Sequence, residues 1–196
     1  MAEALSKAHL PPLASWLRAV LWSIAWLVAA VMGQPSRSQD LTLEYAIEAT
    51  YLLNLSPFVT WPNAAAEFPG GAFILCVVGG DPFGGLLDRV VSDQRVDNHP
   101  IVIRRFAAVI GNPDCSVMYV TGPVDEVAAD LTAVREMPVL TVTDNATAPA
   151  ATGIINFLIV DKRVRFDIDN GTAAADGLTI SSKLLSLAMH VTGTNR

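Results

Sequence analysis

Two cysteines, Cys76 and Cys115, are the residues of this chain best suited to covalent chemistry. Cys76 lies inside an apolar run at residues 72–78, and Cys115 comes just before a second run at residues 116–120. In a doubly wound sheet with strand order 2-1-3 these runs are neighbours, so the two α-carbons can fall within bridging distance. We therefore predict a disulfide, with two buried free thiols as the alternative. The sequence has no CxxC motif, which disfavours a redox role.

Three other patterns resemble active-site motifs but are better explained as structure. Residues 79–84 lie where phosphate loops occur, yet they do not match GxGxxG, and Asp81 would repel a phosphate. His99 and His190 lie far apart in the sequence and make a poor metal set. In residues 181–183 a serine and a lysine are adjacent rather than one helical turn apart, which favours a helix cap over a catalytic dyad. We expect no catalytic residue, metal ion or cofactor.

A surface is the remaining candidate for function. Arg163, Arg165 and Asp167 alternate with apolar residues, so they share the exposed face of a strand. Together with Phe157 on the preceding strand, they would form a charged and aromatic patch. Arginine and aromatic residues are enriched in binding hot spots, and a sheet edge is a natural docking site. We predict that these four residues bind a partner; the alternative is a solvated face with cross-strand ion pairs.

The elements that would position these residues alternate between strand and helix. We expect helices at 41–55, 83–91 and 123–136, and strands at 72–78, 101–106, 116–120 and 139–142. Residues 153–160 and 163–168 are predicted to form a hairpin around Asp161 and Lys162. Ser181 or Ser182 is expected to cap a last helix whose apolar stripe runs to Val191. The pattern predicts a three-layer, Rossmann-like α/β fold: a mostly parallel sheet with a C-terminal antiparallel hairpin.

Composition and the N-terminal segment set the broad class. Of 196 residues, 52% are hydrophobic and 16% charged, which excludes a disordered chain, and the net charge of −6 argues against nucleic-acid binding. Lys7 and Arg18 precede an uncharged run at 19–33 that is shorter than the roughly 20 residues of a spanning helix. We predict a signal peptide at residues 1–33, with an uncleaved anchor as the alternative, and a single domain at 41–193.

The chain also carries an ordered set of motifs that resembles the YfiR-like family of secreted bacterial domains. Those motifs occupy residues 48–55, 58–59, 61–62, 74–79, 81–84, 139–144, 153–157, 164–168 and 177–185. The resemblance covers about residues 43–191, and family members share a cysteine pair at the spacing of Cys76 and Cys115.

The resemblance implies a periplasmic, dimeric regulator without catalytic activity. Such a regulator represses a membrane-bound diguanylate cyclase by binding its periplasmic sensor part, and so affects cyclic-di-GMP signalling and biofilm formation. In the family's circuit an outer-membrane lipoprotein can sequester the regulator and release the cyclase. The alternative function is a periplasmic sensor or binding domain for a small ligand, held at the ends of the strands.

Overall fold

A computed structural model describes residues 37–62, 68, 71–144, 148 and 151–193, with side chains from residue 43 onward. The predicted signal peptide lies outside the described residues. Contacts group the chain into one unit from Met1 to Asp40 and another from Leu41 to Arg196, and the fold outlined next belongs to the second unit. Within the described part of the chain, no helix is both long and apolar enough to cross a membrane.

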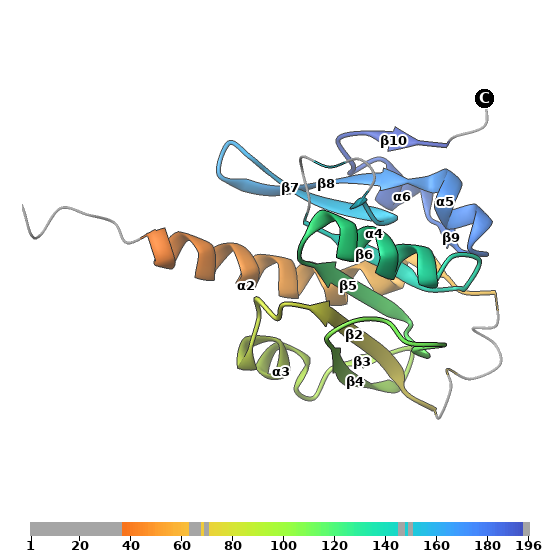
Figure 1. The fold of residues 1–196 in the computed structure, drawn as a ribbon, viewed down its shortest axis with the longest axis horizontal. Helices are drawn as coiled ribbons and strands as arrows, with labels where there is room; N and C mark the ends of the chain where they lie inside the picture. Colours follow the sequence, from red (N-terminus) through yellow and green to blue (C-terminus); the bar gives the residue numbers. More distant parts are fainter. Residues whose placement is uncertain (1–36, 63–67, 69–70, 145–147, 149–150, 194–196) are drawn as a thin grey trace, which may run out of the picture. The chain divides into compact units, whose positions relative to one another are not determined.

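Eight strands form one sheet in the order β10-β8-β7-β6-β5-β2-β4-β3 (Figure 1). The strands β4, β2, β5, β6 and β7 pair in parallel, while β7 with β8 and β3 with β4 are antiparallel. The predicted mostly parallel sheet with a C-terminal antiparallel hairpin is therefore confirmed. The strands are β2 (Phe73–Gly79), β3 (Arg95–Val96), β4 (His99–Phe106), β5 (Val117–Thr121), β6 (Leu140–Thr143), β7 (Ile155–Val160), β8 (Arg163–Asp169) and β10 (Val191–Thr192).

Helices cover the two faces of this sheet and complete the three layers. In Figure 1, α2 passes behind the sheet and α4 lies in front of it. A separate two-stranded sheet joins β1 to β9. The remaining elements are α2 (Arg37–Leu55), a 3-10 turn (Ser56–Phe58), β1 (Val59–Thr60), α3 (Gly85–Val91), α4 (Val124–Ala133), α5 (Asn170–Ala175), β9 (Thr179–Ile180) and α6 (Ser182–Leu185).

The apolar core is divided by the sheet into two clusters, and β2 contributes to both. Phe73, Leu75 and Val77 pack in the cluster that contains residues of α2 and α3. The alternate residues Ile74 and Cys76 pack with Val127 of α4 in the other cluster. A strand buried on both faces needs apolar residues at every position, which is why residues 72–78 form a continuous apolar run.

The predicted hairpin is present and has a two-residue turn. Asp161 and Lys162 have φ angles of 50° and 59°, as a type I′ turn requires. The turn sets the register, in which Val160 lies opposite Arg163 and Phe157 opposite Phe166. Strand β8 alternates as expected, with Val164, Phe166 and Ile168 buried while the intervening side chains are exposed or half-buried.

The end of the chain differs from the prediction. Ser181 caps α6 by accepting a hydrogen bond from the Leu184 N–H, but the helix ends at Leu185 and does not reach Val191. Residues 186–192, here called the C-terminal strap, follow the helix, and from Met189 onward the strap runs along β8. The Met189 N–H donates to the Phe166 carbonyl, and the Ile168 N–H donates to the His190 carbonyl. These bonds at the sheet edge replace those that a longer helix would have made.

Candidate functional site

Cys76 and Cys115 form the predicted disulfide, with their α-carbons 5.9 Å apart. Cys76 is in the middle of β2, and Cys115 precedes β5, the parallel neighbour of β2. The predicted 2-1-3 order corresponds to β4-β2-β5 and is what brings the two residues together. Cys76 is 0% and Cys115 6% exposed, and both pack in the core cluster beneath α4. The bond therefore links two core strands at a buried position.

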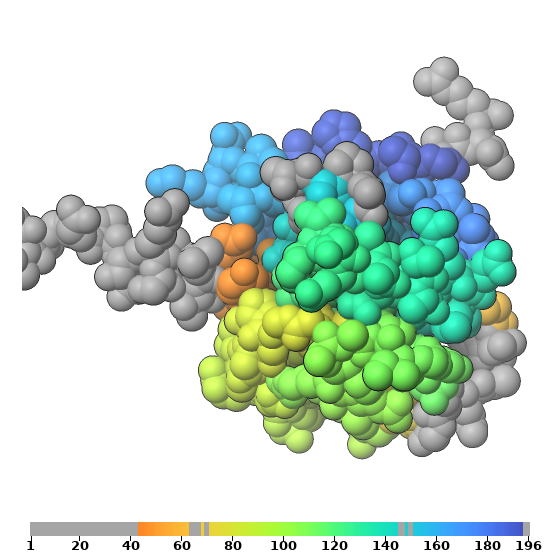
Figure 2. All heavy atoms as spheres, viewed as in Figure 1, coloured from red at the N-terminus to blue at the C-terminus, as the bar shows by residue number. Residues whose placement is uncertain are grey.

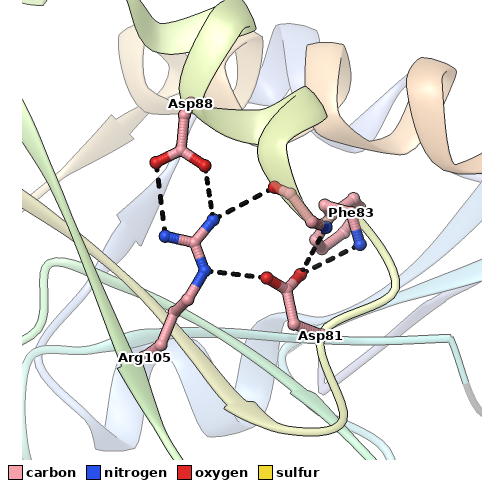
Figure 3. A network of polar contacts seen from close by, with 5 residues as sticks. Asp81, Phe83, Asp88 and Arg105 are labelled. Carbon is pink, nitrogen blue, oxygen red and sulfur yellow. Dashed lines mark hydrogen bonds and ion pairs between the residues drawn. The ribbon is translucent and has the colours of Figure 1, made fainter.

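The glycine-containing loop after β2 has its backbone donors occupied by a side chain of the chain itself. The Asp81 carboxylate accepts hydrogen bonds from the N–H groups of Phe83 and Gly84, at 2.9 and 3.0 Å (Figure 3). A phosphate could not use these N–H groups, because the Asp81 carboxylate already occupies the position that the phosphate would take. This geometry agrees with the sequence-based interpretation of residues 79–84 as a tight turn.

Arg105 on β4 holds that loop in place. Its Nε donates to Asp81 at 2.7 Å, its Nη2 donates to Asp88 at 2.7 Å, and the same Nη2 reaches the Gly84 carbonyl at 3.1 Å (Figure 3). The hydrogen bond and charge of Arg105 lower the pKa of the Asp88 carboxyl. Most of the guanidinium donors are thus used within the chain, so this loop presents a closed network rather than an open anion site.

Glu48 on α2 is a buried acid that none of the sequence motifs indicated. It is 1% exposed, and its Oε2 accepts a hydrogen bond from the Tyr119 hydroxyl at 3.3 Å. Burial, together with the negative charges of Asp144 and Glu44, raises the pKa of Glu48 to about 8. Burial together with Glu48 also raises the pKa of Tyr119. Glu48 lies on the apolar stripe of its helix. An acidic residue at such a position is the sequence feature that indicates a buried carboxyl group.

The predicted partner-binding residues are only partly brought together. Arg163 and Arg165 are exposed on β8, and within the described residues neither guanidinium has a hydrogen-bond or ion-pair partner. Asp167 follows on the same face and contacts His190 of the C-terminal strap, with 3.0 Å between Asp167 Oδ1 and His190 Nδ1. The backbone N–H of His190 also donates to the same Asp167 oxygen.

The placement of Phe157 in the exposed patch is wrong. Phe157 is 1% exposed, because it lies opposite Phe166 on the buried face of the hairpin. Its ring packs 6.0 Å from that of Tyr51 on α2. Phe157 thus belongs to the core beneath the hairpin, and a partner that docks on Arg163 and Arg165 meets the opposite face of the strands.

A hollow of about 510 Å³ lies beside the two arginines. It is lined by Val160, Asp161, Arg163, Arg165, Leu187 and Met189. The last two belong to the C-terminal strap and are 60% and 45% exposed. In the space-filling view the hairpin and the C-terminal segment lie beside each other at the upper edge of the domain (Figure 2). The site thus combines two cations and one carboxylate with exposed apolar side chains.

A second hollow, of about 410 Å³, lies between α4 and α5. Two acidic side chains that line it accept hydrogen bonds from backbone N–H groups. Asp176 accepts a hydrogen bond from the Glu136 N–H, and Asp169 accepts one from the Thr172 N–H. Across the described residues, no group of three or more histidine, cysteine, aspartate or glutamate side chains is placed to hold a metal ion.

Comparison with known proteins gives one family. A sequence model of the family described as YfiR/HmsC-like matches residues 45–189, which include α3, α4, the disulfide and the hairpin. No curated protein matches the chain.

Proposed function

The chain belongs to the YfiR/HmsC-like family, and from this membership we infer that it is a periplasmic regulatory binding protein. We propose that it represses a membrane-bound diguanylate cyclase by binding the cyclase's periplasmic sensor part, and that this lowers cyclic-di-GMP and biofilm formation. The proposal includes export through the signal peptide at residues 1–33, a homodimer as the working form, and no catalysis. The disulfide supports an oxidising compartment such as the periplasm.

The mechanism is reversible occlusion rather than turnover. A bound regulator stabilises the inactive arrangement of the sensor, and its removal shifts the population of the cyclase toward the active state. An outer-membrane lipoprotein that binds the same regulator would remove it by competition. Such a mechanism needs a surface whose binding groups are not already used within the fold.

Arg163 and Arg165 provide such a surface, and the observation that carries the proposal is that neither has a partner within the described part of the chain. The guanidinium of Arg105 is satisfied by two aspartates, whereas those of Arg163 and Arg165 stand free among the described residues. Arginine is enriched in binding hot spots because it offers several donors in a planar fork. We propose that Arg163 and Arg165 form the docking surface, that Asp167, which already contacts His190, borders it, and that Phe157 supports the strand from the core.

Deletion and rescue test the proposal. Deleting the gene should raise cellular cyclic-di-GMP, and the wild-type gene should restore the low level. The double variant Arg163→Ala, Arg165→Ala should fail to restore it and should lose binding to the periplasmic fragment of the cyclase. Arg89→Ala, which removes an exposed arginine from α3, is the matched control and should restore it. An unchanged cyclic-di-GMP level after deletion would contradict the proposal.

The hollow beside Arg163 favours one alternative function, a small-ligand sensor. Its volume of about 510 Å³ lies within the roughly 300–1,000 Å³ of small-molecule sites. A ligand that binds only the folded protein would raise the melting temperature by mass action. A thermal shift with a small molecule, without binding to a cyclase fragment, would favour this function over repression.

A further inference from the structure

The outer edge of β8 is only partly paired. The C-terminal strap covers the end of this strand, from Phe166 to Asp169, through backbone bonds and the pairing of β10. Residues Arg163–Arg165 have a strand partner on the β7 side, and no strand of the described chain pairs with them on the other. The chain thus leaves a short open edge beside the hollow.

Backbone alternation shows which groups face that open edge. Val160 and Arg163 flank a two-residue turn, so this pair and every second pair after it exchange hydrogen bonds across the hairpin. The remaining residues turn their groups outward, as the bonds of the Phe166 carbonyl and the Ile168 N–H to the C-terminal strap demonstrate. By the same alternation, the N–H and carbonyl of Val164 and the N–H of Phe166 point outward, and no strand of the described chain lies beside them.

We propose that an extended segment of the partner adds to the sheet as a strand along Arg163–Phe166. This inference rests on the proposed function and specifies how the partner is held. The backbone of the segment would bond to Val164 and to the Phe166 N–H, as in other cases of strand addition. Its side chains on the face of Arg163 and Arg165 would enter the hollow.

The lining of the hollow defines the chemistry of that segment. Two guanidinium groups that have no partner in the described part of the chain favour carboxylates, while Leu187 and Met189 favour apolar side chains. The single carboxylate of the lining, Asp161 in the hairpin turn, leaves the two arginines in excess. The two arginines also stand out as a cationic site in a chain whose net charge is −6. The segment that fits is a short strand that carries acidic and apolar residues.

The same charges argue against a second copy of this chain as the occupant. If two β8 edges paired antiparallel about a two-fold axis, Arg163 and Arg165 of one copy would lie opposite those of the other. Like charges directly across a strand pair are unfavourable. A partner with acidic residues at these positions turns the same contact into an attraction.

Val164→Pro tests the proposal while it leaves the hydrogen bonds between β7 and β8 in place. Proline removes the outward N–H and places its ring at the open edge, while the bonds between β7 and β8 involve other residues. Val164→Ala is the matched control, because it also loses the side chain but keeps the N–H. For the periplasmic fragment of the cyclase we expect Val164→Pro to bind at least about tenfold more weakly. Val164→Ala should stay within about threefold.

Amide hydrogen exchange gives a second measurement. It uses the wild-type protein, so its outcome does not depend on whether a variant folds. Adding the cyclase fragment should protect the amides of Val164 and Phe166. Binding without this protection, or equal binding by Val164→Pro and Val164→Ala, would overturn strand addition and leave the proposed function standing. No binding by the wild type would overturn both. Protection that appears when the chain alone is concentrated would identify a second copy as the occupant and also overturn the proposal.

Discussion

The parallel part of the sheet and its antiparallel end bury their side chains in different ways. In β5 and β6 all but one residue are buried, and β2 is buried from Phe73 to Val78, because α2 and α4 cover both faces of these strands. In β8 the burial alternates, because only the face toward Tyr51 and Phe157 is covered. The same sheet therefore has a part that is enclosed and an end whose second face is open.

The two regions also differ in whether their arginines have bonding partners within the chain. Arg105, on the parallel strand β4, bonds to Asp81 and Asp88 and fixes a loop. Arg163 and Arg165, on the antiparallel strand β8, have no such partners among the described residues. Arg105 of the parallel part is used to hold the fold, while the two arginines of the antiparallel end are left available for another molecule.

Phe157 tests whether the covered face of the antiparallel end contributes as much to stability as the parallel core. Phe157→Ala should lower the free energy of unfolding by about 3–5 kcal/mol, since it removes a ring that is 1% exposed. Urea denaturation measures this change. Ile159→Ala lies on the same face two residues away, but its side chain is 47% exposed, so its cost should stay below about 1 kcal/mol. Equal, small losses for both variants would contradict the burial of Phe157.

Removing the disulfide tests the parallel part in the same way. The double variant Cys76→Ala, Cys115→Ala should lose roughly 3–4 kcal/mol, because the bond closes a loop of 39 residues in the unfolded chain. The control is the wild type with reductant, which should lose a similar amount, while the variant should not respond to reductant. Two reactive thiols in denatured, unreduced wild-type protein would show that the bond is absent.

The predictions from sequence succeeded where local pattern and burial agree. The continuous apolar run at Phe73–Val78 and the strand-helix alternation after it were enough to order β4, β2 and β5, and that order placed the two cysteines together. The two-residue turn at Asp161 and Lys162 fixed the hairpin. The register of that hairpin also puts Phe157 opposite Phe166, so the burial of Phe157 followed from information already present in the sequence.

The remaining differences arise from contacts between distant parts of the chain. The apolar stripe after Ser181 predicts a long helix, but bonds from the C-terminal strap to Phe166 and Ile168 of β8 compete with it and end the helix at Leu185. The helix α5 was missed because Asn170 and Gly171 at its start are typical of loops, and the cap from Asp169 is what stabilises it. The hollow beside Arg163 depends on the C-terminal strap and could not be predicted without it.

The pH dependence of stability tests whether the buried carboxyl of Glu48 is protonated in the folded protein. The folded protein holds the Glu48 proton up to a pKa of about 8, whereas the unfolded chain loses it near the ordinary value of 4.5. The unfolded state therefore binds fewer protons between these values, and the stability of the wild type should fall as pH rises from about 4.5 to 8. Glu48→Gln removes this loss and keeps an oxygen that can accept from Tyr119.

The stability difference between Glu48→Gln and the wild type should be near zero at pH 4 and on the order of 2–3 kcal/mol in favour of the variant at pH 7. Denaturation across this pH range measures it, and Glu126→Gln, at an exposed position on α4, is the control that should show no such trend. A variant that gains no stability between pH 5 and 8 would mean that Glu48 is ionised and solvated in the fold.

The smallest effect on stability is expected at the open end, where the largest effect on binding is proposed. Arg165→Ala should change the free energy of unfolding by less than about 0.5 kcal/mol, because the side chain is exposed and has no partner to lose among the described residues. Arg105→Ala is the same substitution on the parallel strand β4 and should cost up to about 1 kcal/mol, since it breaks two partly exposed ion pairs. Thermal unfolding and binding to the cyclase fragment are measured for both variants. Together they distinguish an arginine that stabilises the fold from one that binds the partner. If Arg165→Ala destabilised the fold as much as Arg105→Ala and left binding unchanged, Arg165 would serve the fold as Arg105 does, and the distinction between the two regions would fail.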